Sequence, residues 1–326
     1  MPQVTVTGAS GRLGCTLVRA LLAHGDQVRV LEHGSGIPAS LQGLDVDIVY
    51  GSVLDKQAVD AAIGDAQIVY HLAAKVELDR DLDGSVVAIN VEGTRNVAAA
   101  CLHRGIRMVH TSSHHALVLQ PLNVPLDESR PLALDHPCFY HRSKAQGEAL
   151  IQTMVQQGLN AVIVNPGTIT GPQDFEPSML GQGLIDLANG KLPALLNIAS
   201  DCADVRDIAA AMITAATAGR TGERYLLSGE PAPMRELAQL WSDISGCKVP
   251  RVFLPLWFGW FIIPFTIASA RLTRRKPLFT PNMLRASICN DVVCCDKAKR
   301  ELGYRPRPLQ ASLQDAFDFY QQEGWL

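Results

Sequence analysis

The sequence has little net charge, no internal repeat and no low-complexity tract. Its 326 residues include 29 basic and 32 acidic side chains, which gives a formal net charge of -3. A chain this close to neutral has no strongly basic surface, so we expect no nucleic-acid partner, and the 47% hydrophobic content excludes a disordered chain. The length predicts one large α/β domain with a smaller partner.

The cysteines show neither a Cys-x-x-Cys pair nor a regular spacing, which argues against a disulfide framework and against a zinc site. The eight cysteines lie at positions 15, 101, 138, 202, 247, 289, 294 and 295. We interpret them as reduced thiols of a cytoplasmic protein. The first expected strand begins near residue 3, which leaves no room for a signal peptide, so secretion is not expected.

Long hydrophobic runs are also scarce, and residues 254–270 are the exception. A membrane span needs about 20 apolar residues. This run is shorter, and Pro255, Gly259 and Pro264 interrupt it. Two alternatives stay open: peripheral association with a membrane surface, or packing over a substrate pocket or subunit interface. A basic cluster follows the run at Arg271, Arg274, Arg275 and Lys276.

The first half of the chain alternates short β-branched runs with longer helical patterns, which predicts a parallel sheet covered by helices on both faces. The expected strands are 4–7, 28–31, 46–50, 68–72, 108–111 and 161–164. The expected helices are 13–24, 85–104 and 140–157, each followed by a glycine suited to a left-handed cap. The fold class is therefore α/β, a Rossmann-type doubly wound parallel sheet.

The second half has a looser pattern. It predicts helices over 174–196, 204–218 and 234–245 and a strand over 224–227. We therefore divide the chain into a dinucleotide-binding domain over residues 1–170 and a smaller α/β substrate lobe over most of 171–326, with some segments returning to the first domain.

A glycine-rich turn connects the first expected strand to the first expected helix. Gly8 permits a tight turn, Gly11 lets the backbone approach a pyrophosphate, and Gly14 allows the helix to pack closely on the strand. The free N–H groups at the start of the helix then bind the phosphates. This context predicts a nicotinamide dinucleotide site.

Glu32 ends the second expected strand, where a carboxylate accepts hydrogen bonds from the adenosine ribose and repels a 2′-phosphate. This position favours NAD. Arg12 and His33 favour the opposite choice, because either is close enough in sequence to meet a 2′-phosphate, so NADP stays open.

A second constellation consists of Tyr140 and Lys144, with Ser112 and Ser113 upstream at a strand end. Residues four apart lie on one face of a helix, where the ammonium lowers the pKa of the phenol and holds the nicotinamide ribose. The tyrosine then exchanges a proton with a substrate oxygen during hydride transfer, and a serine orients that oxygen.

Together these residues resemble the extended branch of the short-chain dehydrogenase/reductase superfamily, the NAD-dependent epimerase/dehydratase family, over nearly the whole chain. Within it the chain is similar to dihydroflavonol-reductase-like and 3β-hydroxysteroid-dehydrogenase-like groups. The resemblance implies a homodimer and makes Ser113 the catalytic hydroxyl, with Ser112 as its rival. It also implies cofactor contacts at Gly8, Ser10, Gly11, Arg12, Leu13, Gly14, Glu32, His33, Ser52, Val53, Leu72, Ala73, Ala74, Lys75, Asn90, Thr111, Tyr140, Lys144, Pro166, Gly167 and Thr168.

The sequence departs from the sugar-nucleotide members, which usually have an arginine where this chain has Asn165. We therefore expect hydride transfer between NAD or NADP and a secondary alcohol, ketone or aldehyde of a fairly apolar small molecule. A nucleotide-sugar epimerase or dehydratase is the alternative, and a non-catalytic cofactor-binding protein is a third. Ser112, His114 and His115 are candidate pocket residues. A zinc site from His110 and His114 is not expected, because an extended segment holds the two too far apart.

Overall fold

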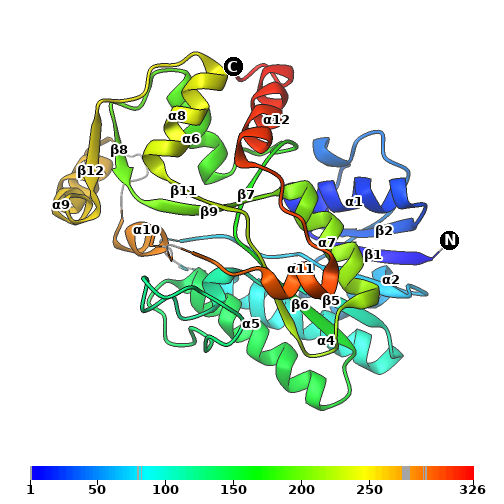
Figure 1. Ribbon diagram of the computed structural model, residues 1–326. Coiled ribbons are helices and arrows are strands. Elements are labelled where there is room, and N and C mark those ends of the chain that lie inside the picture. Colours follow the sequence, from blue (N-terminus) through cyan, green and yellow to red (C-terminus); the bar gives the residue numbers. More distant parts are fainter. Residues whose placement is uncertain (1, 79–80, 82, 274–279, 289, 291) are drawn as a thin grey trace.

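A parallel sheet of seven strands lies at the centre of the larger part of the molecule (Figure 1). The computed structural model describes residues 2–78, 81, 83–273, 280–288, 290 and 292–326. The strands of the sheet are β1 Gln3–Thr7, β2 Gln27–Glu32, β3 Val46–Tyr50, β4 Ile68–His71, β5 Arg107–Thr111, β6 Ala161–Pro166 and β10 Arg224–Leu227. Their order is β10-β6-β5-β4-β1-β2-β3, and all neighbours are parallel. The strands that follow β1 in the sequence are placed first on one side of it (β2, β3) and then on the other (β4, β5, β6). Folds of this kind bind ligands at the point where the strand order reverses, here between β1 and β4.

Helices cover both faces of this sheet. The helical segments are α1 Arg12–His24, η1 Ala39–Leu41, α2 Lys56–Ile63, α3 Ser85–Val87, the π-helical η2 Ala88–Gly93, α4 Thr94–Arg104, η3 His114–Ala116, α5 Phe139–Gln156, α7 Val205–Ala218 and α11 Asp296–Leu302. Apolar side chains of α1, α7 and α11 share one buried cluster, and those of α2, α4 and α5 share another. The predicted doubly wound α/β fold is confirmed.

The smaller lobe combines short strands with helices. A three-stranded sheet holds β7 Thr168–Thr170, β9 Ala199–Asp204 and β11 Glu230–Pro233, and a pair holds β8 Ala194–Asn197 and β12 Val252–Pro255. Its helices are α6 Met179–Ala188, α8 Met234–Ser245, α9 Leu256–Thr273, α10 Pro281–Ala286 and α12 Leu309–Gln322. Trp241 of α8 and Tyr320 of α12 are fully buried at the centre of the lobe.

The helix predicted over 174–196 is wrong in extent. Ser178 caps a shorter helix, α6, through a hydrogen bond in which its Oγ accepts from the N–H of Gly181, at 3.1 Å. The chain then turns at Gly190, whose φ of 68° lies in the left-handed region, and continues into β8. Helical spacing of apolar residues therefore extended the prediction past a glycine that stops the helix.

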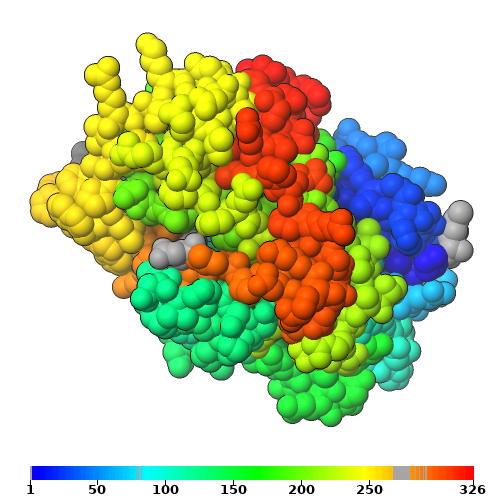
Figure 2. Space-filling model, viewed as in Figure 1, coloured from blue at the N-terminus to red at the C-terminus, as the bar shows by residue number. Residues whose placement is uncertain are grey.

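The apolar run at 254–270 divides into the end of β12 and most of α9. Helix α9 lies at the edge of the lobe, far from α1 and α2 (Figure 1). Its side chains form part of the outer surface at the left of the space-filling view (Figure 2). Within the described part of the chain, no helix has the length and hydrophobicity that a membrane crossing requires.

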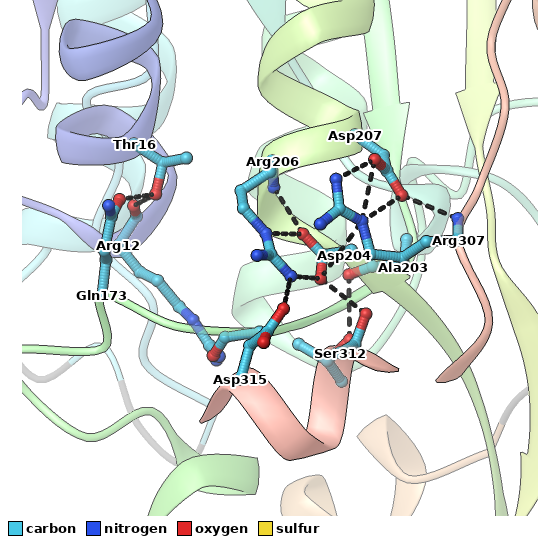
Figure 3. A network of polar contacts seen from close by, with 12 residues as sticks. Arg12, Thr16, Gln173, Ala203, Asp204, Arg206, Asp207, Arg307, Ser312 and Asp315 are labelled. Atoms are coloured by element: carbon cyan, nitrogen blue, oxygen red, sulfur yellow. Dashed lines mark hydrogen bonds and ion pairs between the residues drawn. The ribbon is translucent and has the colours of Figure 1, made fainter. Parts of the chain in front are cut away.

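Ion pairs join the start of α7 to the start of α12 (Figure 3). Asp204 is buried at the amino end of α7, where its Oδ1 accepts from the N–H of Arg206 at 2.8 Å and its Oδ2 accepts from Ser312 Oγ at 2.6 Å. Arg307, just before α12, pairs with Asp207 at 2.6 Å. The lobe is thus fastened to a helix that packs on the central sheet.

Candidate functional site

The glycine turn between β1 and α1 has the shape that a bound pyrophosphate requires. A Cβ on Gly8, whose φ is 71°, would lie 2.6 Å from the nitrogen of Ala73, and a Cβ on Gly14 would lie 2.0 Å from the carbonyl oxygen of Gly8. A Cβ on Gly11 would meet its nearest atom at 3.6 Å, so this position opens to free space. Gly8 and Gly14 close the turn, and Gly11 leaves room in front of the first N–H groups of α1, where phosphate groups fit.

Glu32 is buried at the carboxyl end of β2, on the same side as the glycine turn. Its Oε1 accepts hydrogen bonds from Ser10 Oγ and from the N–H of His33, both at 3.1 Å. Its Oε2 is buried without a partner in the structure. A buried carboxylate oxygen is costly to leave unpaired, and a ribose hydroxyl is the donor that fits it. The imidazole of His33 is 88% exposed.

Arg12 points toward the smaller lobe. Its Nη1 donates to the carbonyl of Ile169 at 3.1 Å and to Ser178 Oγ at 3.3 Å, and lies 3.3 Å from Asp174 Oδ2. Figure 3 shows Arg12 beside Gln173, the residue that precedes Asp174. The positive charge that the sequence suggested for a 2′-phosphate is therefore already paired with Asp174.

The segment after β3 lies at the far end of this site. Ser52 is exposed, and Val53 is buried against Gly93. The carbonyl of Val53 accepts from Asn96 Nδ2 at 3.0 Å. Of these two predicted cofactor contacts, Ser52 is the one whose side chain is exposed to solvent.

Asn90 holds the chain segment that follows β4. Its Oδ1 accepts from the N–H of Lys75 at 2.8 Å, and its Nδ2 donates to the carbonyl of Lys75 at 3.0 Å and to Ser143 Oγ at 2.9 Å. The N–H of Ala73 donates to Thr7 Oγ1 at 3.3 Å, next to the glycine turn. The amide of Asn90 thus positions the segment from Leu72 to Lys75 relative to α5.

Tyr140, Lys144 and Ser113 come together between α5 and the end of β5. Burial raises the pKa of Tyr140, and the Ser113 hydroxyl beside it opposes the rise. Lys144 Nζ donates to the carbonyl of Thr111 at 2.9 Å. Burial lowers the pKa of Lys144 to about 8. Ser113 and Lys144 are buried and Tyr140 is half-buried, and the three residues share the corner between α5 and the end of β5.

The two serines at the end of β5 face different partners. Ser112 Oγ donates to Glu148 Oε2 at 2.6 Å. Glu148 Oε2 also accepts from Asn165 Nδ2, at 2.8 Å. Arg224 Nε lies 2.9 Å from Glu148 Oε1. Because Ser112 is engaged in this buried network, Ser113 is the serine whose hydroxyl meets Tyr140.

We expect Glu148→Ala to lower the free energy of unfolding by about 3–5 kcal/mol, because it leaves Arg224 charged and buried without its partner. Chemical denaturation measures the change. The control is Glu92→Ala, which breaks a surface pair with Arg95 whose side chains are 56% and 50% exposed, and which should leave stability nearly unchanged. Equal effects from the two variants would contradict this account of the network.

Four histidine rings form a continuous stack beside Tyr140. The ring centroids of His114 and His115 are 3.9 Å apart, those of His115 and His141 are 4.2 Å apart, and those of His141 and His136 are 4.4 Å apart. Burial lowers the pKa of all four, that of His141 to about 3, so the stack is neutral at ordinary pH. His110 lies elsewhere and stacks on His71 at 5.6 Å.

A pocket of 360 Å³ adjoins the outer end of this histidine stack. Apolar side chains dominate its lining, and His136, Asp135 and Arg285 add polar atoms. The pocket lies between the chain segment around 118–137 and the region of α10. It offers an apolar surface, and His136 is the residue that it shares with the histidine stack.

Pro166, Gly167 and Thr168 connect β6 to β7, and Asp201 lies directly against them. A Cβ on Gly167 would lie 2.2 Å from Asp201 Oδ2. That oxygen is buried without a partner, whereas Oδ1 accepts from the N–H of Gly229 at 3.2 Å. Burial raises the pKa of Asp201 to about 7. Only a glycine leaves room for this carboxyl.

Asp201→Asn is expected to stabilise the fold increasingly as pH rises. The unfolded carboxyl loses its proton near pH 3.8, whereas the folded one keeps it up to about pH 7. Wild-type stability therefore falls between these values as pH rises, and the asparagine does not titrate. From about pH 4.5 to about pH 8 the advantage of the variant should grow by on the order of 2–3 kcal/mol in denaturant titrations. A pH-independent difference between wild type and variant would contradict a buried titrating carboxyl.

These features define a dinucleotide-binding α/β protein with a Ser–Tyr–Lys corner. The chain belongs to the NAD dependent epimerase/dehydratase family, whose model matches residues 4–228. It is 33% identical to sterol demethylase protein B of Methylococcus capsulatus, with 98% of this chain and 99% of that one covered. It is 30% identical, over 98% of this chain and 96% of that one, to the 4-hydroxy-2-methyl-3-oxo-4-farnesyl-3,4-dihydroquinoline-1-oxide ketoreductase of Stigmatella aurantiaca. The crystal structure of gox2253 superimposes with a TM-score of 0.88 at 31% identity, covering all of both chains.

Family and relatives together make the protein an NAD(P)-dependent oxidoreductase.

Several residues of the site were not predicted from the sequence. The sequence could have indicated Glu148, because it follows Lys144 by four residues and so lies on the same face of α5 as Tyr140 and Lys144. Arg224 and Asp201 had none, since they come from distant strands that only the fold brings beside β6.

Proposed function

We propose that the protein transfers a hydride between a nicotinamide cofactor and the carbonyl or alcohol carbon of a largely apolar small molecule. The observation that carries the proposal is the corner between α5 and the end of β5, where Tyr140 lies beside Ser113 and Lys144 donates to the carbonyl of Thr111. When bound, the cofactor supplies or accepts the hydride. The side chains of the corner carry out the proton transfer that accompanies it.

Tyr140 gives its proton to the substrate oxygen during reduction and takes it back during oxidation. Ser113 donates a hydrogen bond that orients this oxygen and stabilises negative charge on it. The ammonium of Lys144, fixed by the Thr111 carbonyl, stabilises the phenolate left on Tyr140. The same ammonium would hold the nicotinamide ribose.

An apolar substrate is supported by the pocket beyond the histidine stack. Val118, Leu132, Leu134 and Ile288 line it. His136 is the ring of the stack that lines this pocket, whereas His114, at the opposite end, is a neutral ring whose Nδ1 contacts the carbonyl of Pro166 at 3.0 Å. The relatives named for a sterol and for a farnesylated quinoline also support a ring system with large apolar area.

Glu32 supports NAD as the preferred cofactor, because its buried carboxylate would repel a 2′-phosphate. We expect Glu32→Ser to lower kcat/KM with NADH by about tenfold and to raise the ratio of NADPH to NADH activity. Glu92→Ser is the control, because it makes the same substitution at a carboxylate that is 56% exposed and pairs with Arg95. An unchanged cofactor ratio in Glu32→Ser would assign selectivity to other residues.

The proposed reaction is tested by following cofactor absorbance with hydroxysteroids, flavanonols, aromatic aldehydes and nucleotide sugars. Net oxidation or reduction with the apolar compounds supports the proposal. Turnover of nucleotide sugars alone, without net change in the cofactor, would contradict it and indicate an epimerase.

A further inference from the structure

Helix α9 exposes a row of aromatic side chains. Trp257, Phe261 and Phe265 are spaced four residues apart, so they lie along one side of the helix, and they are 68%, 64% and 66% exposed. Trp260, 39% exposed, adjoins them. We call these four residues the α9 patch. Single exposed apolar residues are ordinary, but four large aromatic groups on one helix mark an interaction surface.

The opposite side of α9 already has its packing partner. Ile263 is buried, and a Cβ on Gly259 would lie 3.0 Å from Leu284 Cδ1 of α10. The guanidinium of Arg285 lies 5.3 Å from the ring of Trp260 and also lines the apolar pocket. The patch therefore lies on a helix that packs against α10, and Arg285 of α10 links it to that pocket.

The sequence around the patch is strongly basic. Residues 244–290 contain seven lysines and arginines and no aspartate or glutamate, whereas the rest of the chain contains 22 basic and 32 acidic residues. Lys248 and Arg251, just before β12, are exposed. A basic segment that carries exposed tryptophan and phenylalanine matches a bilayer interface that contains anionic lipids.

We propose that the α9 patch docks on an anionic membrane surface. The aromatic rings enter the interfacial layer while the neighbouring basic residues contact the headgroups. A second copy of the chain fits less well, because a symmetric contact through α9 would bring two strongly basic segments together. Docking would place the mouth of the apolar pocket beside the bilayer, where a hydrophobic small molecule is concentrated, but it does not depend on the reaction proposed above.

Sedimentation of the full-length protein with phosphatidylcholine vesicles, with and without phosphatidylglycerol, tests the proposal. We expect binding to the anionic vesicles, with a blue shift of tryptophan fluorescence, and weakening at about 0.5 M NaCl. The triple variant Trp257→Ser/Phe261→Ser/Phe265→Ser should bind at least about tenfold more weakly. Val124→Ser/Met179→Ser, which alters apolar residues 45% and 60% exposed outside α9, should bind like wild type.

A charge variant provides a second measurement if the triple variant does not fold. Lys248→Glu/Arg251→Glu keeps α9 intact and should lose several-fold of its binding to anionic vesicles. Absence of wild-type binding, equal binding to both vesicle types, or unaltered binding by the folded triple variant would each overturn the proposal. So would a wild-type dimer that the triple variant converts to a monomer, since the patch would then contact a second copy.

Discussion

Tyr140→Phe is expected to lower kcat by about 10²–10⁴-fold and to change KM little, because it removes the proton donor and retains the ring. Burial raises the pKa of Tyr140 and the Ser113 hydroxyl opposes the rise, which places the phenol beside the serine that would orient the substrate oxygen. Steady-state rates with a responsive substrate measure the change. Thermal unfolding should show an intact fold.

Tyr304→Phe is the matched control for this variant. The Tyr304 hydroxyl is buried without a partner and lies outside the Ser–Tyr–Lys corner. Removing it deletes the same atom from the same residue type, so activity should stay at the wild-type value. Undiminished turnover in Tyr140→Phe across all substrates would show that the proton comes from another group.

Lys144→Met should lower kcat/KM by about 10²–10⁴-fold and at the same time stabilise the protein. Burial lowers the pKa of Lys144 from 10.5 to about 8, so at neutral pH the folded protein holds a charged ammonium that its surroundings disfavour. Methionine fills a similar volume without charge. After the lost hydrogen bond to Thr111 is subtracted, we expect a gain on the order of 1–3 kcal/mol in the free energy of unfolding at about pH 7.

The pH dependence distinguishes this cause from better packing. Between pH 8 and 10.5 the unfolded chain still binds a proton at Lys144 and the folded chain does not. Wild-type stability therefore rises through this window, and the advantage of Lys144→Met should vanish above it. Lys191→Met, at a side chain 64% exposed, should change neither activity nor stability. A gain for Lys144→Met that persists unchanged at about pH 10.5 would indicate packing alone.

The sequence predicted the central sheet well because its strands are short β-branched runs and the helices between them end at glycine caps. Gly25, Gly105 and Gly158, at the expected ends of three helices, have φ of 95°, 67° and 105°. The glycine turn follows β1, Glu32 ends the neighbouring strand β2, and the Tyr140 helix comes after β5, so each motif is local in the sequence and such patterns were enough to predict a cofactor site. The smaller lobe offered no comparable pattern, since its strands have three to six residues and pair across long separations.

The choice between the two serines shows where sequence reasoning ended. Ser112 and Ser113 are adjacent in the chain, and alternation along the strand sends their side chains to opposite faces. Which face holds Tyr140 depends on Glu148, Asn165 and Arg224, a helix residue and two from separate strands. That assignment therefore required the folded structure.

The contact between Arg12 and Asp174 joins the glycine turn to the smaller lobe through one side chain. Arg12 is the first residue of α1, whose amino end faces the expected pyrophosphate, and Asp174 lies in the loop that leads to α6 of the smaller lobe. Any shift of that loop that accompanies substrate binding must act on the helix that contacts the dinucleotide. Because binding linkage is reciprocal, the factor by which cofactor alters substrate affinity equals the factor by which substrate alters cofactor affinity. The strength of this one ion pair thus bears on whether the two ligands bind in a fixed order.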